Sequence, residues 1–83
     1  MNRKDTLKWF AGKMMSELDK NTKKLHWRFV PDRSLLFELE NQVNKLGKEL
    51  KVGGSRTEVI HRCANIANYT MMIADNERRF LSK

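Results

Sequence analysis

The run Cys63-Ala-Asn-Ile-Ala-Asn-Tyr-Thr-Met-Met-Ile-Ala-Asp75 determines which fold this chain can adopt. It contains neither glycine nor proline, and its apolar residues recur at the spacing of one helix face. The preceding segment Ser55-Arg-Thr-Glu58 is a capping box, in which the hydroxyl and the carboxylate each satisfy a free backbone amide. We therefore predict a helix over about residues 55–80. Its apolar face comprises Val59, Ile60, Cys63, Ile66, Ala67, Thr70, Met71 and Ile73.

A second helix is expected directly before this one, over about residues 34–52. Its stripe has the 3-4 spacing of a packed helix and comprises Leu35, Leu36, Leu39, Val43, Leu46 and Leu50. Gly53-Gly54 then provides a C-terminal glycine stop. Because only a tight turn separates the two helices, we expect them to pack as an antiparallel hairpin.

A shorter helix is expected at the N-terminus, over about residues 5–20. Asp5 or Thr6 can cap it, because both side chains offer oxygen acceptors to free amides. Its apolar stripe comprises Leu7, Ala11, Met14 and Leu18. The sequence thus predicts an all-α fold, a short N-terminal helix plus an antiparallel two-helix hairpin, in one domain spanning residues 1–83.

The connector over residues 21–33 is expected to run extended across the core. Trp27 and Phe29 alternate with the polar residues His26 and Arg28, which is the period of an extended chain. Pro31 disfavours helix at the residue before it and can begin the next element.

The length of the chain and its single cysteine indicate how the fold is stabilised and in which compartment it occurs. A chain of 83 residues buries a limited core, so homo-oligomerisation is an expected source of stability. The single Cys63 allows no internal disulfide; we expect a buried core thiol, which suits a reducing cytosol. No run of about eighteen apolar residues is present, and no apolar signal core follows the first residues. We therefore expect neither a membrane span nor secretion.

The net charge of +7 is concentrated in the N-terminal third of the chain. Residues 1–28 hold eight Lys and Arg against three acidic residues. Such a balance points to anionic partners, namely nucleic acid, nucleotides or a lipid surface. The alternative is a solvated lysine face that serves solubility alone.

Trp9 is the first candidate binding residue. On a helical wheel it lies opposite the apolar stripe of its own helix, with Lys13 and Lys20 among its neighbours. Two interpretations remain open. Trp9 packs into a subunit interface, where tryptophan is enriched, or it stacks on a nucleobase while lysines neutralise phosphate.

Two further segments offer donors to anions. Lys23, Lys24 and His26 would present several donors to phosphate oxygens, although a plain surface lysine pair is the simpler interpretation. The helix start after Gly53-Gly54 exposes amides beside Arg56, although a simple capped turn is the favoured interpretation.

The C-terminal half, roughly residues 34–76, resembles the MazG-like all-α nucleoside triphosphate pyrophosphohydrolases. That family binds magnesium through Glu-Glu-x-x-Glu and Glu-x-x-Asp on consecutive helices. The matching positions here hold no carboxylate, and two of them are cationic: Asn41, Gln42, Lys45, Arg62 and Asn65. Magnesium prefers hard oxygen ligands. The resemblance therefore implies an enzyme scaffold with no catalytic residues and no metal site.

The whole pattern resembles the small phage proteins that sequester cyclic oligonucleotide signals and so block CBASS, a bacterial anti-phage defence. Those anti-CBASS sponges are short, all-helical and oligomeric. In that family an aromatic residue stacks on a base, a lysine meets the phosphate and a hydrogen-bonding residue follows. Trp9, Lys24 and His26 match these roles, with Trp in place of Tyr and His in place of a hydroxyl residue.

The resemblance implies a non-enzymatic binder of cyclic dinucleotides such as cyclic GMP-AMP, without a cofactor. It also implies a homo-oligomer, most simply a hexamer, in the host cytoplasm. The family has a second site, for cyclic trinucleotides, to which Arg62 or Arg56 would correspond. The alternatives are a divergent pyrophosphohydrolase and a basic nucleic-acid-binding oligomer. The sequence leaves base preference open.

Overall fold

Three α-helices and one short 3₁₀ segment make up the computed structural model, which describes residues 2–20 and 22–81, the side chains of 22–25 excepted. The order is α1 (Arg3–Lys20), η1 (Thr22–Phe29), α2 (Asp32–Val52) and α3 (Arg56–Leu81). No strand occurs in these described ranges. The predicted all-α class is confirmed.

The turn between α2 and α3 follows the predicted chemistry. Gly53 adopts the left-handed conformation with φ 68° and ψ 40°, and the amide of Gly54 donates to the carbonyl of Glu49 at 2.8 Å. Glycine carries no Cβ that would strain this conformation. The amide of Glu58 then donates to Oγ of Ser55 at 3.1 Å, so the serine caps α3 as expected.

The start of α1 differs from the prediction. Asn2 is the cap, because its Oδ1 accepts a hydrogen bond from the amide of Asp5 at 2.9 Å. Asp5 and Thr6, the expected caps, lie inside the first turn of the helix. All three residue types carry a suitable oxygen, and asparagine caps as well as aspartate. The local sequence alone therefore did not show which of the three residues caps the helix.

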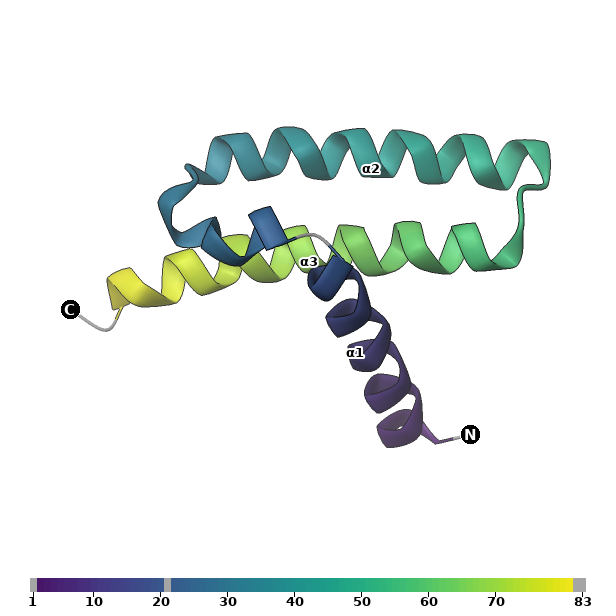
Figure 1. The fold of residues 1–83 in the computed structure, drawn as a ribbon, viewed down its shortest axis with the longest axis horizontal. Coiled ribbons are helices and arrows are strands. Elements are labelled where there is room, and N and C mark those ends of the chain that lie inside the picture. Colours follow the sequence, from purple (N-terminus) through teal and green to yellow (C-terminus); the bar gives the residue numbers. More distant parts are fainter. Residues whose placement is uncertain (1, 21, 82–83) are drawn as a thin grey trace.

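Figure 1 shows how the helices are arranged. α2 and α3 lie side by side, and the chain reverses direction between them. α1 meets α3 only near its own C-terminal end, and its N-terminal half projects away from the other two helices. Leu18, near the end of α1, is accordingly its one buried residue in the described structure.

The core lies where α1, α2 and α3 meet. Leu18, Leu35, Tyr69 and Met72 form the buried cluster, and Trp27 of η1 packs against it. A polar contact also joins α3 to α1: Nδ2 of Asn68, which is fully buried, donates to the carbonyl of Met14 at 3.0 Å. Cys63 is half-buried rather than fully buried.

The connector is helical where an extended segment was expected. η1 is a 3₁₀ segment with a kink at His26, where φ is −108° and ψ is 31°. The amide of Val30 donates to the carbonyl of Trp27 at 2.9 Å and closes the last turn. Pro31 follows and has no amide hydrogen to continue the ladder. Short 3₁₀ segments commonly serve as connectors of this kind.

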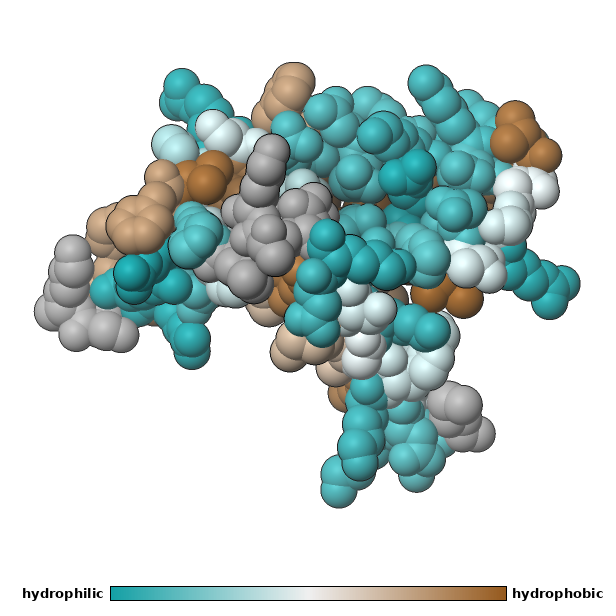
Figure 2. Space-filling view, in the orientation of Figure 1, coloured by the Kyte–Doolittle hydropathy of each residue, from teal (hydrophilic) through white to brown (hydrophobic). Residues whose placement is uncertain are grey.

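The face shown in Figure 2 is mostly hydrophilic, and exposed apolar side chains lie at both ends of the α2–α3 pair. Phe29 and Phe80 lie near one end, and Leu50 and Val52 near the other. Across residues 2–20 and 22–81, no helix is both long enough and apolar enough to traverse a bilayer.

Candidate ligand-binding site

The projecting half of α1 presents an aromatic ring beside a cation. The side chain of Trp9 is 46% exposed, and Nζ of Lys13, one turn further along, lies 6.0 Å from the centre of its ring. The ring of Phe10 also lies near Trp9, with 6.2 Å between the two ring centres. A lysine above an aromatic face is attracted by the π-electrons and stays available to an anion. Trp9 and Lys13 together therefore offer a stacking surface with an attached positive charge.

His26 lies on η1 and is exposed. The side chain of Lys24, the other expected phosphate donor of this segment, lies outside the described residues. Within the described part of the chain, the ring contacts of Trp9 are with Phe10 and Lys13 on its own helix, and none joins it to His26. Of the expected ligand residues with described side chains, Trp9 and His26 are therefore not in ring contact within one chain.

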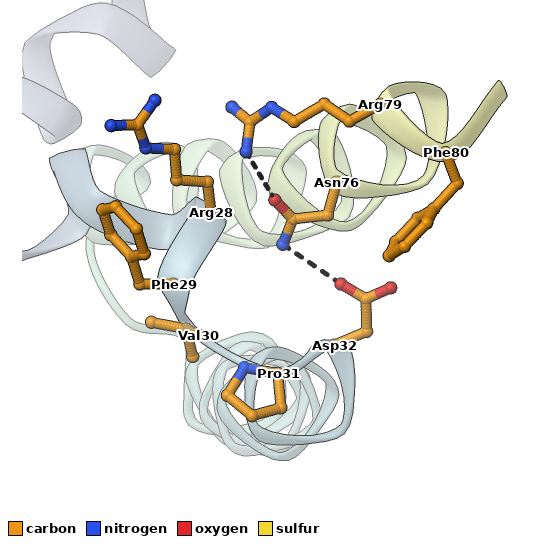
Figure 3. Close-up of a pocket in the computed structure, with 8 residues that line it drawn as sticks. All are labelled: Arg28, Phe29, Val30, Pro31, Asp32, Asn76, Arg79 and Phe80. Atoms are coloured by element: carbon orange, nitrogen blue, oxygen red, sulfur yellow. Dashed lines mark hydrogen bonds between the residues drawn. The ribbon is translucent and has the colours of Figure 1, made fainter. Parts of the chain in front are cut away.

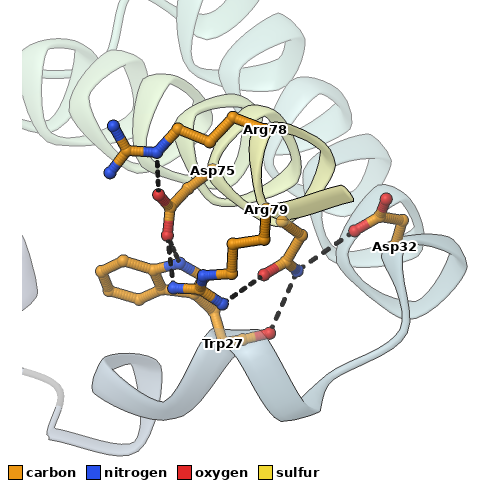
Figure 4. A network of polar contacts seen from close by, with 6 residues as sticks. Trp27, Asp32, Asp75, Arg78 and Arg79 are labelled. Carbon is orange, nitrogen blue, oxygen red and sulfur yellow. Dashed lines mark hydrogen bonds and ion pairs between the residues drawn. The ribbon is translucent and has the colours of Figure 1, made fainter. Parts of the chain in front are cut away.

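A polar network anchors η1 to α3 (Figure 4). Nε1 of Trp27 donates to Asp75 at 2.9 Å, and Nδ2 of Asn76 donates to the carbonyl of Trp27 at 3.2 Å. Asp75 also accepts from Arg78 at 2.7 Å and from Arg79 at 2.6 Å. These bonds fix the connector next to the exposed His26.

Ionised Asp75 should make the stability of the fold decrease at low pH. The hydrogen bonds from Trp27 and Arg78 and the charge of Arg79 hold the pKa of Asp75 below its ordinary 3.8. A lowered pKa means that this stabilisation is complete well above pH 3.8 and is lost as the pH falls through the folded-state pKa. We expect the melting temperature of the parent to fall between pH 5 and pH 2 (roughly the range where such a carboxylate titrates) more than that of Asp75→Asn.

Thermal melts of both proteins across this range measure the difference directly. Asp5→Asn is a suitable control, because its carboxylate lies on an exposed first turn of α1. Parallel pH profiles for the parent and Asp75→Asn would contradict the assigned role of Asp75.

The positions that resemble a magnesium site hold a guanidinium instead. Nη1 of Arg62 donates to Oε1 of Gln42 at 3.3 Å, linking α3 to α2. Nδ2 of Asn65, one turn further along, donates to Glu17 of α1 at 3.1 Å. Among the described residues, no group of three or more His, Cys, Asp or Glu side chains is placed to hold a metal ion. The donors here are amides and a cation, which do not fit magnesium.

Glu17 is a carboxylate that accepts a hydrogen bond from this row of residues, through Asn65. Burial raises its pKa, while the hydrogen bond and charge of Lys20 lower it. The charge of His61 and the hydrogen bond from Asn65 add to the lowering, so the pKa of Glu17 lies below its usual 4.5. Glu17 is therefore an ionised carboxylate held in an ion pair, which suits a structural contact between α1 and α3.

Arg56 is exposed at the turn between α2 and α3, next to Gly53 and Gly54. Trp9 and Lys13 lie on α1, and Arg62 lies further along α3. The structure thus distributes the expected ligand residues over separate regions.

Sequence reasoning missed Asp75 and Asn76. The available signal was the i, i+3 and i, i+4 pairing of Asp75 with Arg78 and Arg79.

Comparisons with protein families, with curated proteins and with solved structures find no match for this chain. Function is therefore inferred from the residues and their geometry.

Proposed function

We propose that this protein binds cyclic dinucleotides such as cyclic GMP-AMP and sequesters them without cleavage. In this proposal it acts in the host cytoplasm as an anti-CBASS sponge. It works by stoichiometry and affinity, so it needs neither a cofactor nor turnover.

The half-exposed ring of Trp9, with Lys13 at 6.0 Å, is the observation that carries the proposal. A nucleobase can stack on an indole, and an ammonium group beside it can neutralise a phosphate. The ring lies on a helix half that projects from the rest of the chain, so a bulky ligand can reach it (Figure 1). Lys24 and His26 are proposed as further contacts to phosphate.

Homo-oligomerisation belongs to the same proposal. α1 exposes Leu7 and Met15, and α2 exposes Phe37 and Val43. A second copy of the antiparallel α2–α3 hairpin or of α1 would remove these side chains from water. A cyclic dinucleotide has two bases and two phosphates related by approximate two-fold symmetry. A two-fold interface offers Trp9 and Lys24 twice, which matches that ligand. A hexamer would combine three such pairs.

The contact between Arg62 and Gln42 supports binding without hydrolysis. Lys45 adds another cation at a position that resembles a metal ligand. Positive charge there would repel the divalent ion on which pyrophosphohydrolases depend. The same charges favour anionic ligands, and Arg56 or Arg62 is proposed for a second site of the cyclic trinucleotide kind.

Titration calorimetry with cyclic GMP-AMP tests the proposal, followed by heat release of the ligand and chromatography. We expect tight binding and recovery of intact cyclic ligand, with a stoichiometry below one ligand per chain if two chains share each site. Linearised product would contradict sequestration without cleavage. No heat at micromolar protein would overturn the proposal. Steeply salt-dependent binding to long DNA or RNA would then favour a nucleic-acid-binding oligomer.

A further inference from the structure

An open groove lies where η1, the start of α2 and the end of α3 meet (Figure 3). Its volume is about 520 Å³, within the range of small-molecule sites. It is lined by Arg28, Phe29, Val30, Pro31, Asp32, Asn76, Arg79 and Phe80. None of these residues belongs to α1, so the groove is separate from Trp9 and Lys13.

Two aromatic rings flank the groove. The side chains of Phe29 and Phe80 are 72% and 67% exposed, and Figure 3 shows them on opposite sides of the opening. Exposed large apolar groups that gather in one place mark interaction sites. A flat ring system entering between them would have an apolar surface on either side, with Val30 and Pro31 lining the groove as well.

The two arginines lie together along one rim (Figure 3). Arg79 is held in place, because Nη2 donates to Asp75 at 2.6 Å and Nη1 donates to Oδ1 of Asn76 at 3.1 Å. Arg28 lies 4.7 Å from the ring centre of Phe29 and has no ion pair within the described part of the chain. Its guanidinium therefore retains donors for an anionic oxygen. Guanidinium groups are well suited to phosphate.

Asp32 lies across the groove from the arginines and accepts rather than donates (Figure 3). Its Oδ1 accepts from Nδ2 of Asn76 at 3.1 Å, which fixes the orientation of the carboxylate. The carboxylate keeps further lone pairs for N–H donors of a ligand. The adjacent ring nitrogen and amino group of guanine provide two such donors on one edge.

We propose that this groove binds a purine nucleoside monophosphate, with guanine favoured. The base lies between Phe29 and Phe80 with its donor edge toward Asp32. The phosphate lies against Arg28 and Arg79. A single nucleotide fits this volume. The proposed cyclic dinucleotide site uses Trp9 of α1, Lys24 and His26 of η1 and a second chain, and neither Trp9 nor His26, whose side chains the structure describes, lines the groove. The two proposals are therefore independent.

Equilibrium dialysis of the full chain with guanosine 5′-monophosphate tests the groove, with guanosine and ribose 5-phosphate as partial ligands. We expect the nucleotide to bind at least tenfold more tightly than either part. Arg28→Ala should weaken the nucleotide at least tenfold and leave guanosine unchanged. Phe29→Ala should weaken both nucleotide and guanosine, because it removes one stacking surface.

Phe37→Ala is the control, because it removes an exposed ring from α2 that lies outside the groove, and it should leave binding of the monophosphate unchanged. Arg28→Ala and Phe29→Ala each change an exposed side chain, so the circular dichroism of both variants should match that of the parent. No binding of the monophosphate at 5 mM (roughly the weakest affinity dialysis resolves) would overturn the proposal. Equal affinity in the parent, Arg28→Ala and Phe29→Ala would also overturn it.

Discussion

Replacing Trp9 by Ala is expected to weaken the binding of cyclic GMP-AMP by about 30-fold or more, the conversion of about 2 kcal/mol. Each base stacked on an aromatic ring contributes roughly 1–3 kcal/mol. If a two-fold interface presents two Trp9 rings, both stacks are lost in one substitution. The fold should be unaffected, because Trp9 is half-exposed and lies on the projecting half of α1. Titration calorimetry against the same ligand measures the change.

Two controls separate stacking from a general surface effect. Trp9→Phe keeps an aromatic face and should retain most of the affinity. Phe80→Ala removes a more exposed ring, at the end of α3 and outside the elements proposed for this site, and should change little. An affinity of Trp9→Ala within about threefold of the parent, corresponding to roughly 0.7 kcal/mol, would show that Trp9 does not stack on the ligand. The interface interpretation of Trp9 would then predict a smaller oligomer for this variant in analytical ultracentrifugation.

The helices were predictable because their signals are local. The stop at Gly53 and the cap at Ser55 depend on residues within one turn, and both are confirmed. The start of α1 was predicted too late, since Asn2, Asp5 and Thr6 can all cap a helix. Neighbouring residues of equal capping ability make a boundary ambiguous from sequence alone.

The connector shows where local signals mislead. Alternation of Trp27 and Phe29 with polar residues suggested an extended chain, but four residues are too few to establish a period. The structure places Trp27 against the core and bonds its indole to Asp75, which is 48 residues away. Tertiary contacts of this range override weak local preference. No reading of residues 21–33 alone reveals them.

The groove was missed for the same reason. Arg28 and Phe29 are separated in the sequence from Arg79 and Phe80 by about fifty residues, and no motif connects the two pairs. They gather only because η1 packs on the last turns of α3. By contrast, Trp9 and Lys13 lie one turn apart on a single helix. A helical wheel therefore predicted that their side chains are neighbours. Sites within one element are readable from spacing, and sites between elements are not.

Met72→Ala is expected to destabilise the protein by about 2–5 kcal/mol, the usual cost of truncating a fully buried methionine. Met72 has no exposed surface and belongs to the cluster that includes Leu18 of α1, Leu35 of α2 and Tyr69 of α3. The substitution leaves a cavity where the three helices meet. At about 0.05–0.15 kcal/mol per residue, a domain of this size has a free energy of unfolding of about 4–12 kcal/mol. Urea denaturation should show a large loss, up to complete unfolding.

Met15→Ala is the matched control, because it removes the same side chain from a 59% exposed position on α1. We expect it to change the free energy of unfolding of the monomer by less than about 0.5 kcal/mol. In an oligomer that covers the exposed side chains of α1, Met15→Ala should instead weaken assembly, and its effect on melting should grow with protein concentration. Equal, small losses for both variants would show that Met72 is not in the core. A concentration-dependent loss for Met15 alone would identify α1 as part of the interface.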